Sequence, residues 1–185
     1  MINDALKEAE TRMEKAVESF REDLLGIRTG RASPSLVERL RVEYYGALTP
    51  LNQIAAVSAP EPRLLVIRPW DPSALGAIEK AIMKSELGLT PNSDGVVIRL
   101  PIPRLTEERR RDLTKVVAKR TEEGHVAVRN IRRDVQEDLR DFEKEKLITE
   151  DELRVGREKL QEVHDRFVKQ MDELGKVKQQ EIMEV

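Results

Sequence analysis

Apolar residues recur at helical spacing in three long stretches of this 185-residue chain. The first stretch covers about residues 3–29, where steps of three and four separate the apolar positions. Asn3 or Asp4 can cap its start, and Gly30 is placed to end it. The pattern predicts a helix with one apolar face, formed by Leu6, Ala9, Met13, Ala16, Phe20, Leu24 and Ile27.

The second stretch begins near Thr106, where Glu107 and Glu108 suit the positive end of a helix dipole. Arg120 and Gly124 interrupt its apolar stripe, which predicts weaker packing at that point. At 1.5 Å per residue, the predicted helix is roughly 60 Å long. The stripe consists of Leu113, Val116, Val117, Ala127, Val128, Ile131, Val135, Leu139 and Phe142.

The third stretch has the clearest start signal in the chain. Thr149 and Glu152 have the spacing of a capping box, flanked by Ile148 and Leu153 as a hydrophobic staple. None of the three helices can bury its stripe alone, so the sequence predicts an elongated three-helix bundle. The third stripe consists of Leu153, Leu160, Val163, Phe167, Met171 and Leu174.

Residues 31–104 differ from the rest because glycine and proline separate short β-rich runs at 42–45, 64–67 and 96–100. A helix is expected between the last two runs, with Asp71 as its N-cap, Pro72 at its first position and Gly88 at its end. The fold class is therefore α+β: residues 1–30 and 105–185 form the bundle, and residues 31–104 form an inserted small β/α/β domain. Chain crossings at 29–34 and 100–104 favour a hinge between the domains.

Composition limits the class of protein. The absence of cysteine excludes a disulfide framework and a thiolate metal site. No apolar run approaches the roughly 20 residues of a membrane span, and residues 1–15 are polar, with no signal-peptide core. We therefore expect a soluble, cytoplasmic protein with no membrane partner.

Charge is unevenly distributed, although the net charge is only −2. Residues 104–133 contain ten Lys/Arg and five Asp/Glu, whereas residues 134–185 contain ten and sixteen. Such asymmetry indicates that an anionic partner touches one part of the molecule.

Within the basic segment, Arg129, Arg132 and Arg133 fall within about 100° of each other, roughly opposite the apolar stripe. A stripe that contacts phosphates and a solvated face with local ion pairs both fit this spacing, and Glu122 lies on the same face. Trp70, Tyr44 and Tyr45 all lie in the α/β part, which disfavours a reader of single-stranded RNA.

Residues for catalysis are not evident. His125 and His164, the two histidines, lie on different predicted helices and are interpreted as surface residues. The sequence has no phosphate-binding glycine loop and no nucleophile elbow. We expect no catalytic residue, no metal site, no cofactor and no enzymatic activity.

Seven short segments carry a more specific signal, in order along essentially the whole chain. They are RTGRA at 28–32, VEYYG at 42–46, PLNQIA at 50–55, IEKAI at 78–82, SELGL at 85–89, LTEERR at 105–110 and RNIRRD at 129–134. Together they resemble the ribosome recycling factor family. The sequence departs from the family pattern at Arg104, where a second proline is common, and at His125, where Lys or Arg is more usual.

The resemblance implies a monomer in which a three-helix bundle and a small domain form an L. It implies binding to the A-site region of the post-termination ribosome, where the bundle contacts large-subunit ribosomal RNA. Elongation factor G with GTP then acts on the family member, and the ribosomal subunits separate and leave the mRNA. Arg132 is the leading RNA contact by resemblance, supported by Arg129, Arg133, Arg28, Arg31 and Arg110. The hinge comprises Gly30, Arg31, Pro101, Pro103 and Arg104.

Two other functions stay open at this point. A ribosome-binding factor could silence ribosomes without splitting them. A helical scaffold or chaperone-like protein would bind partner helices through the apolar stripes, and its binding should resist salt.

Overall fold

A computed structural model describes residues 1–184 of the chain. They form two compact units: a bundle unit, residues 1–24 and 114–180, and an α/β unit, residues 25–113 and 181–184. The two longest helices contribute residues to both units. None of the helices within residues 1–184 is both long and apolar enough to cross a bilayer.

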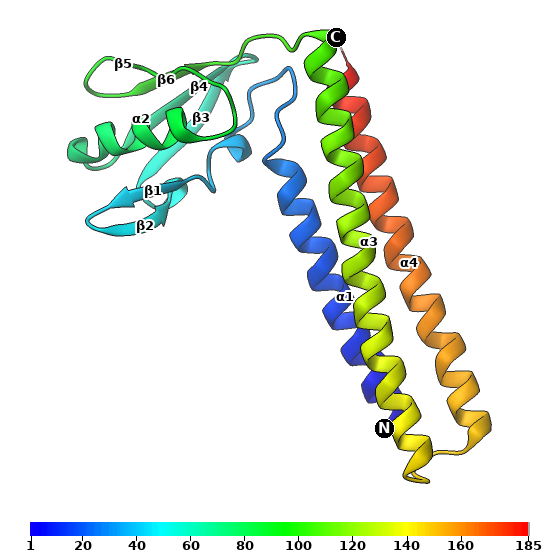
Figure 1. Ribbon diagram of the computed structural model, residues 1–185. Coiled ribbons are helices and arrows are strands. Elements are labelled where there is room, and N and C mark those ends of the chain that lie inside the picture. The colour runs from blue at the N-terminus through cyan, green and yellow to red at the C-terminus, as the bar shows by residue number, and fades with distance from the viewer. Residues whose placement is uncertain (185) are drawn as a thin grey trace. The chain divides into compact units, whose positions relative to one another are not determined.

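The bundle unit is built from three helices, α1 (Ile2–Leu25), α3 (Glu107–Lys144) and α4 (Glu150–Met183), which lie side by side in Figure 1. The predicted starts of the second and third helices are confirmed. The predicted end of the first helix is wrong, because α1 stops at Leu25 and not at Thr29. Gly26 follows directly, and glycine is among the weakest helix formers.

Both long helices begin with a side-chain cap, of which the sequence predicted the one at Thr149. The Thr106 hydroxyl accepts a hydrogen bond from the Arg109 amide at 3.1 Å, before the first turn of α3. In α4, the Glu152 amide donates to the Thr149 hydroxyl at 3.1 Å, and the Thr149 amide donates to the Glu152 carboxylate at 2.7 Å. The capping box is therefore present with both of its reciprocal bonds.

Gly124 marks a close approach of the three helices, so the prediction of weak packing there is wrong. A β-carbon at Gly124 would lie 2.8 Å from the Met171 sulfur and 3.8 Å from the ring of Phe20. Met171 and Phe20 are both buried. The interruption in the stripe is a place where only a hydrogen side chain leaves room for the neighbouring helices.

The α/β unit contains six strands in two antiparallel sheets. A two-stranded sheet pairs β1 with β2, and a four-stranded sheet has the order β3-β4-β6-β5. Strands β1, β4 and β6 correspond to the predicted runs, whereas β2, β3 and β5 were not predicted. The strands are β1 (Arg41–Tyr44), β2 (Ala47–Pro50), β3 (Ala55–Glu61), β4 (Leu64–Pro69), β5 (Asn92–Ser93) and β6 (Ile98–Pro101).

Helix α2 (Leu75–Lys84) lies between the β1–β2 hairpin and the larger sheet (Figure 1). It follows one of three short 3-10 turns, η3 (Pro72–Ala74); the others are η1 (Pro34–Leu36) and η2 (Leu51–Gln53). Its buried residues Ile78 and Ile82 belong to a core that includes Val42 of the hairpin and Leu65 of the sheet. The α+β fold class, with a three-helix bundle and an inserted β/α/β unit, is confirmed.

The predicted bounds of α2 need correction at both ends. Asp71 does act as a cap, because its carboxylate accepts bonds from the Ser73 amide at 2.9 Å and the Ser73 hydroxyl at 2.7 Å, but it caps η3. The helix ends at Lys84 and not at Gly88. Ser85 ends it locally, since both its amide and its hydroxyl donate to the Ile82 carbonyl.

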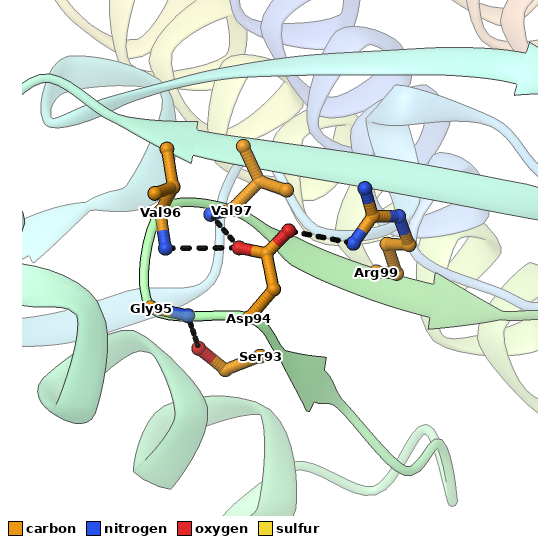
Figure 2. Close-up of polar contacts among 6 residues, drawn as sticks. All are labelled: Ser93, Asp94, Gly95, Val96, Val97 and Arg99. Carbon is orange, nitrogen blue, oxygen red and sulfur yellow. Dashed lines mark hydrogen bonds and ion pairs between the residues drawn. The ribbon is translucent and has the colours of Figure 1, made fainter.

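The turn between β5 and β6 is fixed by Asp94 (Figure 2). One oxygen of its carboxylate accepts the amides of Val96 and Val97, each at 2.9 Å, and the other accepts Arg99 Nη1 at 2.7 Å. The backbone bonds from Val97 and Val96 and the contact with Arg99 lower the pKa of Asp94 to about 2. Gly95 has a φ of +88°, which favours glycine at this position.

Candidate nucleic-acid interface

Arg129, Arg132 and Arg133 lie in α3 within the bundle unit, but their surroundings differ. Arg133 is exposed and has no hydrogen bond or ion pair within residues 1–184. Arg129 and Arg132 are partly buried, and Arg132 Nη1 donates to the side-chain oxygen of Gln161 on α4 at 3.0 Å. Arg132 therefore lies beside the α3–α4 contact and not opposite the apolar stripe, because α3 packs against two helices.

Arg129 is one end of a short chain of charged groups. Its Nη2 lies 3.8 Å from Glu122, whose carboxylate also lies 3.4 Å from His125 Nδ1. His125 Nε2 lies 2.7 Å from Asp172 on α4. The prediction that Glu122 shares the basic face is confirmed, and His125 is partly exposed, with 20% of its side chain accessible.

Gln161 is held on its other side by Asp165 and His164. Gln161 Nε2 donates to Asp165 Oδ1 at 2.8 Å, and His164 Nδ1 lies 2.9 Å from the same oxygen. The bonds from His164 and Gln161, with the nearby charge of Arg132, lower the pKa of Asp165. His164 is also partly exposed, with 13% of its side chain accessible.

Sequence reasoning did not identify Gln161 as part of this site. It is separated from Arg132 by 29 residues and lies on a different helix. Gln161 is not in the apolar stripe and belongs to none of the segments that resemble a known family. Only the rotation of α4 against α3 brings the two side chains together.

The other three predicted RNA-binding residues, Arg28, Arg31 and Arg110, belong to the α/β unit. Arg28 Nη2 donates to the backbone carbonyl of Pro103 at 2.5 Å. Burial, and to a lesser extent the charge of Arg109, lowers the pKa of Arg28. Arg28 thus links two chain segments that are 75 positions apart.

A cavity of about 750 Å³ in the α/β unit brings together most of the remaining arginines. Its charged lining is mixed, because four arginines and two glutamates line it. This composition gives a polar pocket with a positive excess. The lining residues are Thr29, Gly30, Arg31, Pro62, Arg63, Arg104, Leu105, Arg110, Glu181 and Glu184.

The predicted hinge residues lie close to one turn of the α/β unit. Ala32, next to Arg31, donates its amide to the Pro62 carbonyl at 2.7 Å. Ile102, which stands between Pro101 and Pro103, donates to the Arg63 carbonyl, also at 2.7 Å. Pro101 is the last residue of β6, whereas Gly30 and Arg104 line the cavity.

Guanidinium groups arranged in this way suit phosphate oxygens, because each can donate two parallel hydrogen bonds to an anion. Within residues 1–184, no group of three or more His, Cys, Asp or Glu side chains is placed to hold a metal ion. Arginine side chains of this kind can bind the phosphates of an anionic surface.

Comparisons with known proteins all identify the same family. The family model of ribosome recycling factor matches residues 20–183. The ribosome-recycling factor of Roseiflexus sp. (strain RS-1) is 60% identical over 185 residues, which are 100% of both chains. That of Carboxydothermus hydrogenoformans is 55% identical over the same span, again 100% of both chains.

Solved structures agree with the sequence comparison. A solution structure of the ribosome recycling factor has a TM-score of 0.77 and 45% identity, and covers 100% of this chain and 98% of that chain. The T. thermophilus ribosome recycling factor, in models with E. coli elongation factor G bound to the E. coli post-termination complex, has a TM-score of 0.67 and 46% identity over 100% of both chains. The chain belongs to the ribosome recycling factor family.

Proposed function

We propose that the chain recycles ribosomes after translation termination. It binds the A-site region of the post-termination ribosome and, with elongation factor G and GTP, promotes separation of the subunits and release of the mRNA. The observation that carries this proposal is the full-length match to ribosome-recycling factors at 60% identity. The match to a factor bound, with elongation factor G, to a post-termination complex supports both partners.

Arg132 is the proposed leading contact with large-subunit ribosomal RNA, and Arg129 and Arg133 extend that contact along α3. Arg133 is free for a phosphate within the described chain, and Arg132 has a neutral partner, so neither needs to give up an ion pair. Arg31 and Arg110 form a second basic region in the α/β unit. Arg28 belongs to that region, although its hydrogen bond to Pro103 gives it a structural role as well.

The chemical step of recycling belongs to the partner. Elongation factor G hydrolyses GTP, so the proposed function requires neither a catalytic residue nor a cofactor in this chain. A monomer that acts on ribosomes in the cytoplasm satisfies this role.

We also propose that residues 31–104 move as an inserted domain about hinges near 30–33 and 101–105. The bonds of Ala32 and Ile102 to the 62–63 turn support a shared fixed point for the two crossing segments. Small-angle X-ray scattering at several temperatures tests this, since a hinged chain gives an ensemble of inter-domain distances and a rigid one gives a single distance.

Light scattering of purified post-termination ribosomes tests the proposed function. We expect scattering to fall only when this chain, elongation factor G and GTP are all present, because separated subunits scatter less light than intact ribosomes. Omission of each component in turn is the control. Binding without a fall in scattering would indicate a silencing factor, and absence of binding would return the scaffold function to consideration.

A further inference from the structure

We propose that Gln161 is a positioning residue that holds the Arg132 guanidinium ready for a ribosomal RNA phosphate. The inference rests on the proposed function, because it assigns a role through Arg132. It adds to the proposed function a role for Gln161, which lies on α4, and it explains why the hydrogen-bond partner of Arg132 is a neutral side chain.

The orientation of the Gln161 amide follows from its neighbours. A glutamine amide has one accepting oxygen and one donating nitrogen, whereas an ionised carboxylate only accepts. Asp165 Oδ1, 2.8 Å away, therefore takes the amide nitrogen, and this leaves the amide oxygen directed at Arg132 Nη1, 3.0 Å away. The Asp165 carboxylate thus determines which end of Gln161 faces Arg132.

His164 contacts both Asp165 and Gln161. Its Nδ1 lies 2.9 Å from Asp165 Oδ1 and 3.4 Å from Gln161 Nε2, and its side chain is largely buried. A ring fixed by burial restricts the rotamers of the carboxylate that it contacts. Side chains of α4 at positions 161, 164 and 165 therefore form one hydrogen-bonded support for an arginine on α3.

Two other arginines of the bundle unit, unlike Arg132, are paired with carboxylates. Arg12 pairs directly with the carboxylate of Asp134 at 2.8 Å, and Arg166 pairs with Glu10. A phosphate that approached either arginine would have to displace a carboxylate. Arg132 is instead bound by a neutral oxygen, and its Nη2 group has no hydrogen-bond acceptor within residues 1–184.

The Gln161 bond is expected to fix the Arg132 side chain before binding without neutralising its positive charge. A long side chain that becomes fixed only on binding costs about 0.5–1.5 kcal/mol in lost rotamer freedom, which corresponds to roughly a two- to tenfold change in affinity. Fixing Arg132 beforehand removes part of that cost. Its positive charge remains available, because within residues 1–184 no carboxylate forms an ion pair with the guanidinium and Asp165 acts on it only at longer range.

A double-mutant cycle of Gln161→Met and Arg132→Ala tests the inference. Methionine has a similar length but cannot accept the Arg132 bond. The dissociation constant for purified large ribosomal subunits is measured by competition with labelled wild-type protein. We expect Gln161→Met to weaken binding by roughly three- to tenfold in the wild-type background and by less than about twofold beside Arg132→Ala.

Gln179→Met is the matched control. Gln179 is also on α4 and also bonds to α3, but its partner is the backbone carbonyl of Thr114 at 3.1 Å. Its replacement should have the same effect on binding with Arg132 present or absent. Unfolding midpoints of all variants show whether each one remains folded.

Gln161→Glu gives a second readout, because its carboxylate cannot donate to Asp165, which repels it, but can pair with Arg132 and neutralise it. We expect its affinity to fall less steeply with salt than that of Gln161→Met. Equal losses from Gln161→Met in both backgrounds would overturn the positioning role while leaving the proposed function intact. No loss from Arg132→Ala itself would overturn both the inference and the proposed RNA contact.

Discussion

Arg132 in the bundle unit and Arg28 in the α/β unit are both arginines, but their hydrogen-bond partners differ. Arg132 donates to the side-chain oxygen of an exposed glutamine. Arg28 donates to a backbone carbonyl, and burial lowers its pKa. A guanidinium that binds a side chain can exchange it for a phosphate, whereas one that binds the backbone of its own fold can do so only by loosening that fold. Basic residues that look equivalent in sequence should therefore separate into those that affect ribosome binding and those that affect stability.

The largest expected effect is on binding, at Arg132. Replacing Arg132 by Ala should weaken binding to the large ribosomal subunit by about 1–3 kcal/mol, because a charge-assisted contact is lost. The free energy of unfolding should fall by less than about 1 kcal/mol, because the one bond that is lost is to the side chain of the exposed Gln161. Competition binding and urea unfolding measure the two quantities. Unchanged binding would remove Arg132 from the interface.

The opposite result is expected at Arg28. Arg28→Ala should lower the free energy of unfolding by about 1 kcal/mol, because the Pro103 carbonyl loses its donor. Arg31→Ala is the matched control, since Arg31 is exposed and its side chain has no hydrogen bond within residues 1–184. Urea unfolding measures both variants. Equal stability of the two would mean that the Arg28 bond does not stabilise the fold.

Arg129 is intermediate, because its partner is an exposed carboxylate that a phosphate must displace. Glu122→Gln should therefore strengthen ribosome binding, by less than about 1 kcal/mol for so exposed a pair. Glu162→Gln changes the net charge equally, but Glu162 has no ion pair within the described residues. If both variants strengthen binding equally, the effect is one of net charge and not of the Arg129 contact.

The smallest expected effect is on acid stability, at Asp94, where an arginine is bound by a carboxylate within one turn. The pKa of Asp94 is about 2 in the folded chain and 3.8 without these contacts. A carboxylate with a lowered pKa stabilises the fold above the unfolded pKa and loses that contribution as pH falls through the folded pKa. The difference in melting temperature between wild type and Asp94→Asn should therefore shrink between about pH 5 and about pH 2. A constant difference would contradict this account.

The sequence was sufficient to predict those structural features that depend on a few consecutive residues. The reciprocal bonds of Thr149 and Glu152 need only four consecutive residues, and the capping box was predicted with its helix. Strand β3 could not be predicted in the same way, because Ala55–Glu61 is mostly exposed and lacks alternation. Its place in the sheet depends on pairing with β4.

The candidate site shows the same limit. The arginines of α3 could be recognised from their spacing and from a family resemblance. Their partners could not, since Gln161 meets Arg132 only through the packing of α4 on α3. Gly124 was misinterpreted for a similar reason: its neighbours Met171 and Phe20 come from two other helices. Helical periodicity shows which side of a helix is buried, but not how two helices are rotated against each other.

The central claim, that Arg132 contacts a phosphate of the large ribosomal subunit, is tested most directly by a salt titration. The dissociation constants of wild type and Arg132→Ala are measured over a range of salt concentrations and plotted on logarithmic axes. Loss of one phosphate contact should make the mutant's slope shallower by about 1. Parallel lines for the two proteins would contradict the claim, because they would mean that Arg132 releases no counterion on binding.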